Sequence, residues 1–499
     1  MALKLTSKLK RLLRPLVGRR ETRPLQSVLD PQSYGEQRHI GCFRTVWTET
    51  LDLQSSSSID VKIHAGLDAA AISVEAPIHR LPAEVLGIIF VYTLDHLRDR
   101  RQWAPKVDDP HIILCGVCKR WRDVAISMPM LWSAFPAYSV GENNDMALYR
   151  LWLERTRGAP LVINFDTLGC DREFDAALTL FLSHSYQWAD VTITLQPLTL
   201  AKLLEIQPEN VPLLKKVHIR ILAYEHRFTK EDAKKIISTL APMPTLSDLS
   251  WDFHIPAHIS SLTWPNLRKF ATRMSVVTAE CLELLSCLPQ IEDIFFGNYV
   301  HCPIDIVSSP VAVENLHSLS IESCDDPAEL FNALTLPSLN ALLLPRPEDC
   351  SSLERLIDRS GCTLRHLTIC AMGARYDHLL HELPSFLELK CFYFICSLRL
   401  TFMQLLTDQV AERLTWNSDD GSLTQLFPYL STVEIARCDT TDGVFSRMIA
   451  SRWKGRHRPY GLKRVELPQR FWKWGHRKTD IATLNCLKEQ GLEIIRELY

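Results

Sequence analysis

The chain has 499 residues, of which 46% are hydrophobic, and its formal net charge at pH 7 is −2. A single hydrophobic core rarely extends beyond about 250–300 residues, so several domains or a repeat array are expected. The low net charge excludes a globally basic chain that coats nucleic acid or anionic membrane through charge alone. The sequence contains no run of about eighteen uncharged apolar residues, so no transmembrane helix is predicted.

The chain contains 15 cysteines, and most of them stand singly inside apolar stretches such as "ECLELLSCLPQ". With no signal peptide expected, this pattern favours reduced, buried thiols and a location in the cytoplasm or nucleus. Cys115 and Cys118 have the spacing of a zinc or redox pair, but no second pair or histidine cluster accompanies them. We expect both thiols to pack in the core, and we expect no metal and no cofactor.

The first twenty residues, "MALKLTSKLKRLLRPLVGRR", interleave lysines and arginines with leucines and carry no acid. A basic amphipathic helix on a membrane surface, or a transit peptide, is one interpretation. Arg14-Pro15 interrupts such a helix, so a frayed terminus is the preferred one. We assign residues 1–76 to a poorly ordered basic N-terminus and linker.

Residues 77–139 predict a small helical unit. In "PIHRLPAEVLGIIFVYTLDHL", which begins at Pro77, apolar residues recur at helical spacing. A second helix is predicted in "HIILCGVCKRWRDVAISM" and a short third element in "PMLWSAFPAY". Short helices over about sixty residues form a small core, and such a unit usually gains stability by docking on something else.

The remainder repeats one phrase, x-L-x-x-L-x-L. Copies begin at residues 265, 289, 314, 337, 362 and 384, in steps of 24, 25, 23, 25 and 22, and further copies begin at 212, 244, 428 and 460. Each phrase predicts a turn into a short strand, and the intervening segments predict helices. One strand and one helix cannot bury their own apolar face, so neighbouring repeats must stack. Residues 140–499 therefore predict an α/β solenoid with a parallel sheet on one side, and "IATLNCLKEQGLEII" predicts its C-terminal cap.

Two family resemblances follow. "LPAEVLGIIF", with the later "VCKRWRDVA" and "PMLW", resembles an F-box, although the intervening loop is long. The repeats are similar to irregular leucine-rich repeats, and Cys324 and Cys438 match the family's Asn/Cys position. The whole order is similar to the large F-box families of mushroom-forming fungi. The predicted fold class is α+α/β: a three-helix F-box at 77–139, then an irregular leucine-rich-repeat-like α/β solenoid at 140–499.

The F-box resemblance implies a partner. An F-box binds a Skp-type adaptor, which connects it to the cullin and RING subunits of a ubiquitin ligase, and the repeat domain then captures a substrate protein. We therefore expect a non-catalytic substrate-recognition subunit whose substrate protein is unknown. The resemblance assigns adaptor binding to Leu81, Pro82, Val85, Leu86, Ile89, Val117, Trp121 and Trp132.

Three alternatives remain open. An enzyme is disfavoured because G-x-S-x-G, H-E-x-x-H, P-loop and Rossmann patterns are all absent, so we assign no catalytic residues. Sequence alone cannot distinguish a scaffold that binds the adaptor without ligase activity from a substrate receptor. The third is binding to nucleic acid or another anionic partner through residues 451–478, which interleave cations and aromatic rings. Its candidate residues are Arg452, Lys454, Arg456, Arg458, Lys473 and Trp474. We prefer a terminal repeat with a charged outer surface.

Overall fold

The structure of the protein is a computed structural model. It describes residues 77–98, 110–136, 146–165, 171–195, 197–221, 229–253, 255, 259–262, 264–302, 310–324, 326–345, 350–370, 383, 385–401, 406–417, 426–454, 461–473 and 475–497. The chain divides into two compact units, residues 1–74 and 75–499, and every described residue lies in the second. The prediction for residues 1–76 thus falls almost entirely outside the described residues. No described helix is long and apolar enough to cross a membrane.

One 14-stranded sheet runs through the described chain, and each strand pairs in parallel with the next. Its members are β1 Ala134–Pro136, β2 Leu161–Phe165, β3 Trp188–Leu195, β4 Lys216–Ile221, β5 Asp248–Asp252, β6 Lys269–Val277, β7 Asp293–Val300, β9 Ser318–Ile321, β11 Ala341–Leu344, β12 His366–Cys370, β13 Ser397–Thr401, β14 Thr432–Ile435, β15 Arg464–Pro468 and β16 Glu493–Glu497. A separate two-stranded sheet pairs β8 Val311–Ala312 with β10 Leu334–Thr335.

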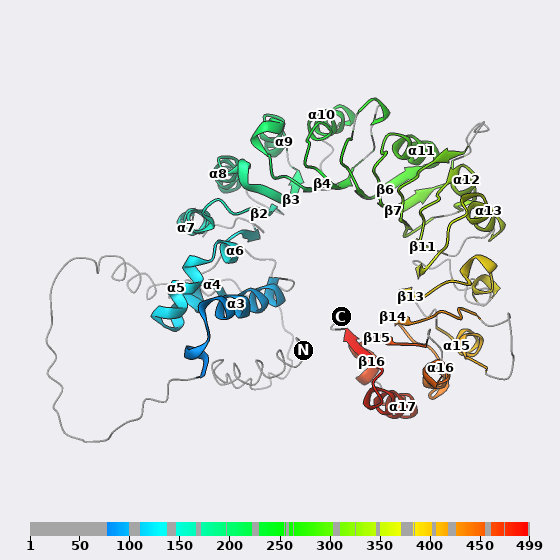
Figure 1. Cartoon of the computed structure of the whole chain (residues 1–499). Helices are drawn as coiled ribbons and strands as arrows, with labels where there is room; N and C mark the ends of the chain where they lie inside the picture. The colour runs from blue at the N-terminus through cyan, green and yellow to red at the C-terminus, as the bar shows by residue number, and fades with distance from the viewer. Residues whose placement is uncertain are drawn as a thin grey trace, which may run out of the picture. The chain divides into compact units, whose positions relative to one another are not determined.

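Helices cover one face of the sheet and leave the other face open (Figure 1). After the N-terminal helices, which are described below, they are α7 Met146–Thr156, α8 Asp171–Leu182, α9 Pro197–Leu203, α10 Lys230–Leu240, α11 Thr278–Ser286, α12 Ala328–Asn332, α13 Cys350–Ser360, α15 Asp408–Leu414, α16 Val444–Lys454 and α17 Lys478–Glu489. Short 3-10 helices stand at Ser185–Gln187, Pro208–Asn210, Ile259–Ser261, Lys390–Phe392 and Gln469–Lys473.

The core lies between the sheet and these helices. Counted from the residue at which each copy begins, the third, sixth and eighth residues of the phrases that form strands are buried, as Leu316, Leu319 and Ile321 show, whereas the fifth and seventh face the open side. Parallel strands joined by helices bury their apolar residues only when neighbours stack. The prediction of a mixed α/β chain with a large parallel sheet is confirmed, and the arrangement is consistent with a solenoid.

The repeats are joined by a recurring backbone interaction at the turn before each strand. The carbonyl of the fourth residue of a phrase accepts hydrogen bonds from the fourth and fifth N–H groups of the next phrase, at 2.7–3.1 Å. The acceptors are Lys215, Ser247, Arg268, Glu292, His317, Asn340, Arg365, Cys396 and Ser431. Because these contacts involve only backbone atoms, any residue type with a backbone N–H, that is, any except proline, can occupy the fourth position.

One predicted strand is wrong. "PSFLELKC" does not form a strand: residues 385–387 are helical, and a 3-10 helix follows at Lys390–Phe392. The spacing of Leu383, Phe386 and Leu387 is that of a helix face, and all three are buried. The strand of this repeat is β13, so its phrase is "YFICSLRL" from Tyr393. The strand starts from β12 to β15 are consequently 31, 35 and 32 residues apart.

The sheet is also longer than the phrases predicted. It begins at β1, inside the range assigned to the F-box, and includes β2 and β3, which precede the first predicted phrase. These strands were missed because "APLVINF" and "QWADVTITL" lack the x-L-x-x-L spacing. At the other end, the segment predicted as a cap, residues 481–495, contains most of α17 and the start of β16, which is a further strand of the sheet.

Charged residues of alternating sign run across the open face of the first half of the sheet. Asp190, Lys216, Asp248, Lys269 and Asp293 are direct cross-strand neighbours on β3 to β7. Ion pairs link Lys216 with Asp248 and Lys269 with Asp293. Opposite charges at paired positions stabilise a register, whereas like charges oppose it, so the ladder favours this one alignment of the strands.

A buried ion pair fastens α17 to α16. Asp480 is fully buried and accepts hydrogen bonds from the backbone N–H groups of Gly443 and Ser446 at 3.0 and 2.9 Å. It also accepts one from the Arg477 guanidinium at 3.0 Å, and that guanidinium donates to the carbonyl of Cys438 at 2.8 Å. Every partner of the carboxylate is therefore inside the protein.

We expect Asp480→Ala to lower the free energy of unfolding by about 3–5 kcal/mol, because it leaves the buried charge of Arg477 without its counterion. Urea denaturation measures this change. The matched control is Glu489→Ala, an exposed acid on the same helix, which should change stability by less than about 0.5 kcal/mol. Equal effects of the two substitutions would contradict a structural role for the pair.

Candidate functional site

The N-terminal unit contains four α-helices rather than the three predicted elements. They are α3 Ala83–Arg98, α4 Pro110–Val117, α5 Lys119–Ser127 and α6 Pro129–Trp132, preceded by a 3-10 helix at Pro77–Arg80. The predicted second helix breaks at Cys118, whose backbone is extended and whose sulfur accepts a hydrogen bond from the N–H of Trp121 at 3.5 Å. A side chain that accepts from the N3 backbone N–H is an N-cap. Cys118 therefore starts α5.

Cys115 and Cys118 show no feature of a metal or redox site. The described residues contain no group of three His, Cys, Asp or Glu side chains that could hold a metal ion. Burial raises the pKa of the Cys115 thiol, although Arg155 and Arg122 act against it. Because the thiolate is the form that binds metals and acts as a nucleophile, this shift disfavours both roles for Cys115. Both cysteines pack against the core.

Large aromatic side chains fill the core of the unit. The rings of Phe90 on α3 and Trp121 on α5 lie 5.0 Å apart, and Leu86 is fully buried between the helices. At Gly87 a Cβ atom would lie 2.4 Å from the sulfur of Met128. The absence of that atom lets the thioether of Met128 lie directly against the backbone of α3.

Trp132 joins this unit to the sheet-bearing part of the chain. Its indole N–H donates to the carbonyl of Ala125 at 2.8 Å, and its ring meets Trp152 of α7 edge-on at 5.7 Å. The guanidinium of Arg155 lies 4.3 Å above the same ring, within the range of a cation–π interaction. Two residues after Trp132 the sheet begins with β1. The unit and the repeats thus share one continuous core.

The N-terminal unit exposes apolar side chains on three of its helices. Val85, Ile88 and Tyr92 recur at three- and four-residue spacing on α3, with exposed fractions of 40%, 55% and 68%. Ile113 and Val117 on α4 and Met130 on α6 are exposed as well. Six of the eleven exposed large hydrophobic side chains of the described chain therefore belong to this unit. Such a concentration marks an interaction surface more often than solvent-facing packing.

The structure divides the predicted adaptor-binding residues into two groups. Pro82, Val85 and Val117 are exposed, and Leu81 and Ile89 are half-buried. Leu86, Trp121 and Trp132 are at most 5% exposed, so they form the core of the unit instead of a surface that a partner can contact. The prediction omitted Ile88, Tyr92, Ile113 and Met130. The period through Val85 identifies Ile88 and Tyr92, but the sequence did not show which side of α3 faces outward.

The structure contradicts one residue of the predicted anionic-partner patch, Arg452. Arg452 is 5% exposed and donates hydrogen bonds to the carbonyls of Leu414, Phe427 and Leu426. Burial lowers the pKa of Arg452 to about 10. This buried guanidinium binds backbone carbonyls and is not accessible to an anion in solvent, so the prediction of an anion-binding role for Arg452 is wrong. Lys473 is exposed. The Lys454 side chain, Arg456, Arg458 and Trp474 lie outside the described residues.

A histidine–carboxylate pair lies on the open face of the sheet. His218 Nε2 of β4 is 3.2 Å from the carboxylate of Asp252 on β5, and the Arg220 guanidinium Nε is 3.4 Å from the same imidazole nitrogen. Burial alone would raise the pKa of Asp252, but hydrogen bonds from His218 and from the backbone N–H of Arg273 outweigh it and lower the pKa. The pair is a polar cross-strand contact.

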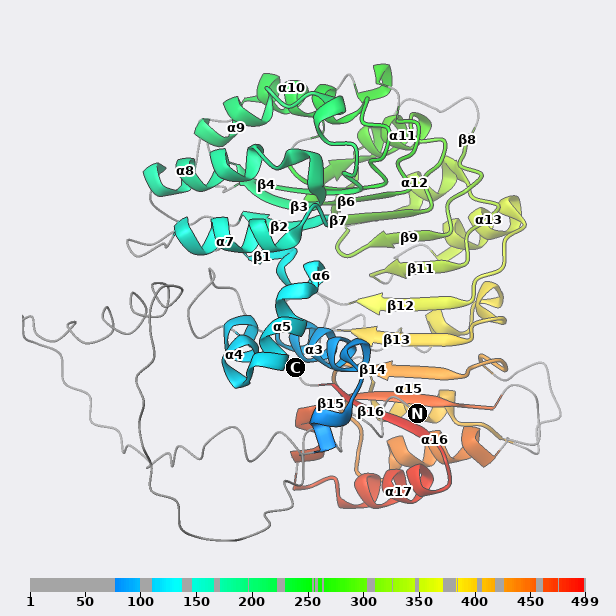
Figure 2. The same cartoon turned by 60° about the vertical axis from the view of Figure 1, so that its left-hand side comes forward.

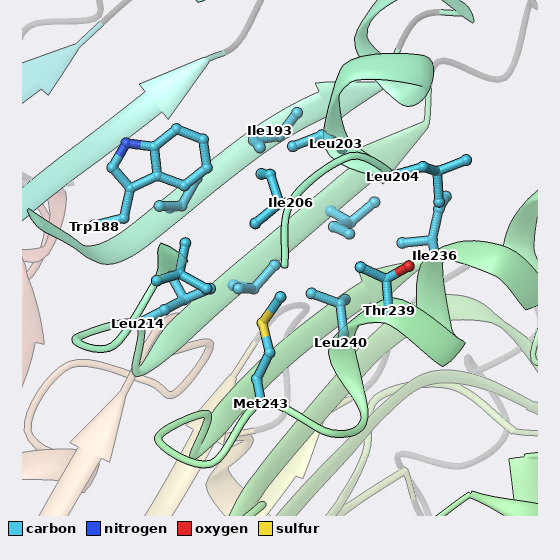
Figure 3. Close-up of a pocket in the computed structure, with 14 residues that line it drawn as sticks. Trp188, Ile193, Leu203, Leu204, Ile206, Leu214, Ile236, Thr239, Leu240 and Met243 are labelled. Carbon is cyan, nitrogen blue, oxygen red and sulfur yellow. The ribbon is translucent and has the colours of Figure 1, made fainter. Parts of the chain in front are cut away.

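Between the sheet and α9 and α10 lies a gap of about 40 Å³. Figure 3 shows the side chains around it, with Trp188 at the left, Leu204 and Ile236 at the right and Met243 below. Among its lining residues Thr239 is the one with a hydroxyl. A bound water needs two to four polar partners, so this gap is an apolar packing defect rather than a ligand site.

Comparisons with known proteins give little. No family model and no curated protein matches this sequence. Among solved structures, the chain is similar to one in "Crystal structure of Rad7 and Elc1 complex in yeast". The two share 12% sequence identity over 72% of this chain and 90% of that chain, with a TM-score of 0.33. A likeness of this degree carries no argument about function.

We expect Trp132→Ala to lower the free energy of unfolding by about 3–5 kcal/mol, because it removes a fully buried ring that two parts of the chain share. Urea denaturation gives the value. Met130→Ala, which truncates an exposed side chain two residues away, should cost less than about 0.5 kcal/mol. A loss below about 1 kcal/mol for Trp132→Ala would mean that the junction is not shared.

The lowered pKa of Asp252 predicts a pH dependence of stability. Its carboxylate stabilises the folded state above the unfolded pKa of about 3.9, and this contribution is lost as the pH falls through the lower folded-state pKa. Asp252→Asn should therefore lower the urea midpoint at pH 7, and the difference from wild type should shrink at pH 3. A difference that stays constant across this range would contradict the assignment.

Proposed function

We propose that this chain is the non-catalytic substrate-recognition subunit of a Skp-cullin-F-box ubiquitin ligase. The observation that carries the proposal is the exposed apolar face of α3, with further exposed apolar side chains on α4, in the segment whose sequence resembles an F-box. In that proposal the Skp-type adaptor covers this face, and cullin and RING subunits join through the adaptor. The complex would work in the cytoplasm or nucleus and would need no cofactor in this chain.

The chemistry of the face suits a helical protein partner. Burial of a large aliphatic or aromatic side chain contributes roughly 1.5–3 kcal/mol, and α3 alone offers Val85, Ile88 and Tyr92. Interfaces depend on a few such anchors near their centre. A row of apolar residues at helical spacing is also the pattern by which helices dock on other helices.

The junction at Trp132 gives the proposal a mechanical basis. Because α6 packs on α7 through Trp132, Trp152 and Arg155, an adaptor on α3 would be held rigidly to the first repeats. A ubiquitin ligase receptor must hold its substrate at a defined distance from the transfer site, and a shared core provides this better than a flexible linker. The chain itself supplies binding and position; the RING subunit and its conjugating enzyme supply the chemistry.

We expect Ile88→Asp to weaken binding of a Skp-type adaptor by at least about tenfold, which corresponds to 1.4 kcal/mol. The reason is that it places a charge in the middle of the apolar face. Isothermal titration calorimetry with purified adaptor measures the change. Leu213→Asp is the matched control, because Leu213 is 38% exposed but lies in the turn before β4, and it should bind normally.

Circular dichroism establishes that both variants are folded. A wild-type chain that is folded and does not bind the adaptor would refute the proposal. If the adaptor binds but the assembled complex transfers no ubiquitin to captured proteins, the chain is an interaction scaffold without ligase activity.

A further inference from the structure

A polar pocket of about 350 Å³ lies at the turn edge of the sheet, where β12 to β15 begin. Residues lining it come from successive repeats: Thr363 and Arg365, then Phe394, then Tyr429 and Ser431, then Lys463. They occupy the second and fourth positions of the phrase x-x-L-x-x-L. Figure 2 shows the four strands side by side, and their pairing is continuous.

Its two cations have no ion-pair partner in the described part of the chain. Arg365 and Lys463 are both exposed. In the first half of the sheet, by contrast, the fourth-position Arg268 pairs with Glu292 of the next repeat at 2.9 Å, and the fifth-position charges pair in the alternating ladder. No acid of the described residues neutralises these two charges, so a molecule that carries negative charge can pair with them.

Aromatic rings lie between the two cations. Phe394 and Tyr429 stack with their ring centroids 5.5 Å apart and their planes at 27°, and Tyr393 meets both rings edge-on. Phe394 remains 47% exposed and Tyr393 37% exposed. A stacked pair with an open side can accept another flat apolar group, since offset stacking adds to the burial of area.

The spacing of these groups fits an extended peptide. Adjacent strands are about 4.8 Å apart, so Arg365 on the β12 side and Lys463 on the β15 side are separated by about 14 Å of backbone. In an extended peptide, residues i, i+2 and i+4 point to one face, and i and i+4 are about 13 Å apart. A peptide lying across the turns can therefore set an acid on each cation and an aromatic residue between them.

We propose that this pocket binds an extended acidic peptide of the pattern acid-x-aromatic-x-acid. Arg365 and Lys463 pair with the two carboxylates, and the ring between them stacks on Phe394 and Tyr429. The inference deepens the proposed function by naming the class of peptide that the substrate would carry. Only the interpretation of this peptide as a substrate segment rests on the proposed function. Binding of the peptide itself needs no adaptor.

The test uses the full chain and a fluorescein-labelled peptide, Gly-Glu-Ser-Tyr-Ser-Glu-Gly, followed by fluorescence anisotropy at low salt. We expect Arg365→Glu and Lys463→Glu each to weaken binding at least tenfold, and Tyr429→Ala to weaken it severalfold. Lys234→Glu, which reverses an exposed cation on α10, is the matched control and should bind as wild type does. A peptide with its two glutamates only two residues apart should bind more weakly than the probe.

Several outcomes would overturn the proposal. Equal affinity for both glutamate spacings, or for a peptide with serine in place of tyrosine, would remove the geometric argument. Equal binding by wild type and Arg365→Glu would place the peptide elsewhere. Competition by inorganic phosphate at the same concentration as unlabelled peptide, or tighter binding of a single-stranded oligonucleotide, would show a general anion site.

Failure of this inference and failure of the proposed function are distinguishable. Ile88→Asp should bind the peptide normally, and Arg365→Glu should bind the adaptor normally. If the peptide binds and the adaptor does not, the pocket stands and the ligase proposal falls. If the adaptor binds and the peptide does not, the ligase proposal stands and the peptide-binding inference falls.

Discussion

The structure depends on one backbone interaction, in which the fourth carbonyl of each phrase accepts two N–H groups from the next repeat. A buried or edge backbone group without a partner is costly, so each turn must be covered by its neighbour. Nine successive carbonyls satisfy this requirement in the same way. Since the contact makes no demand on side chains, the fourth position is free to carry Arg365, Cys396 or Lys463. The side chains available for recognition at this position are therefore independent of the backbone contacts that join the repeats.

Much of the fold could be predicted from sequence, because buried positions obey a strict pattern. The third, sixth and eighth residues of a phrase are buried and, apart from Thr272, apolar in the phrases that form strands, and this predicted most of the strands from β4 to β15. Strands whose context differs were missed: Leu161 and Trp188 begin β2 and β3 without the leucine spacing. At residues 384–391 the leucines fitted both a strand and a helix, and the helix formed.

The candidate site was predicted less completely. A helical period shows that α3 has an apolar face on each side, but it does not show that Leu86 points inward while Val85 and Ile88 point outward; tertiary packing decides that. The sequence likewise did not show that Arg452 is buried. A cation in a basic stretch is expected at the surface, but this guanidinium donates hydrogen bonds to three buried backbone carbonyls. The pocket at β12 to β15 combines residues about thirty positions apart, which no local motif can reveal.

The alternating ladder from Asp190 to Asp293 constrains how this part of the chain can change its length. Removing the repeat of β4, β5 or β6 would bring two aspartates or two lysines onto neighbouring strands, and like charges directly opposite destabilise a sheet. Removing or duplicating two repeats together would keep every acid beside a base. The charge ladder of the first half of the sheet therefore tolerates the loss or gain of two repeats at a time, although the backbone hydrogen bonds repeat with every single repeat.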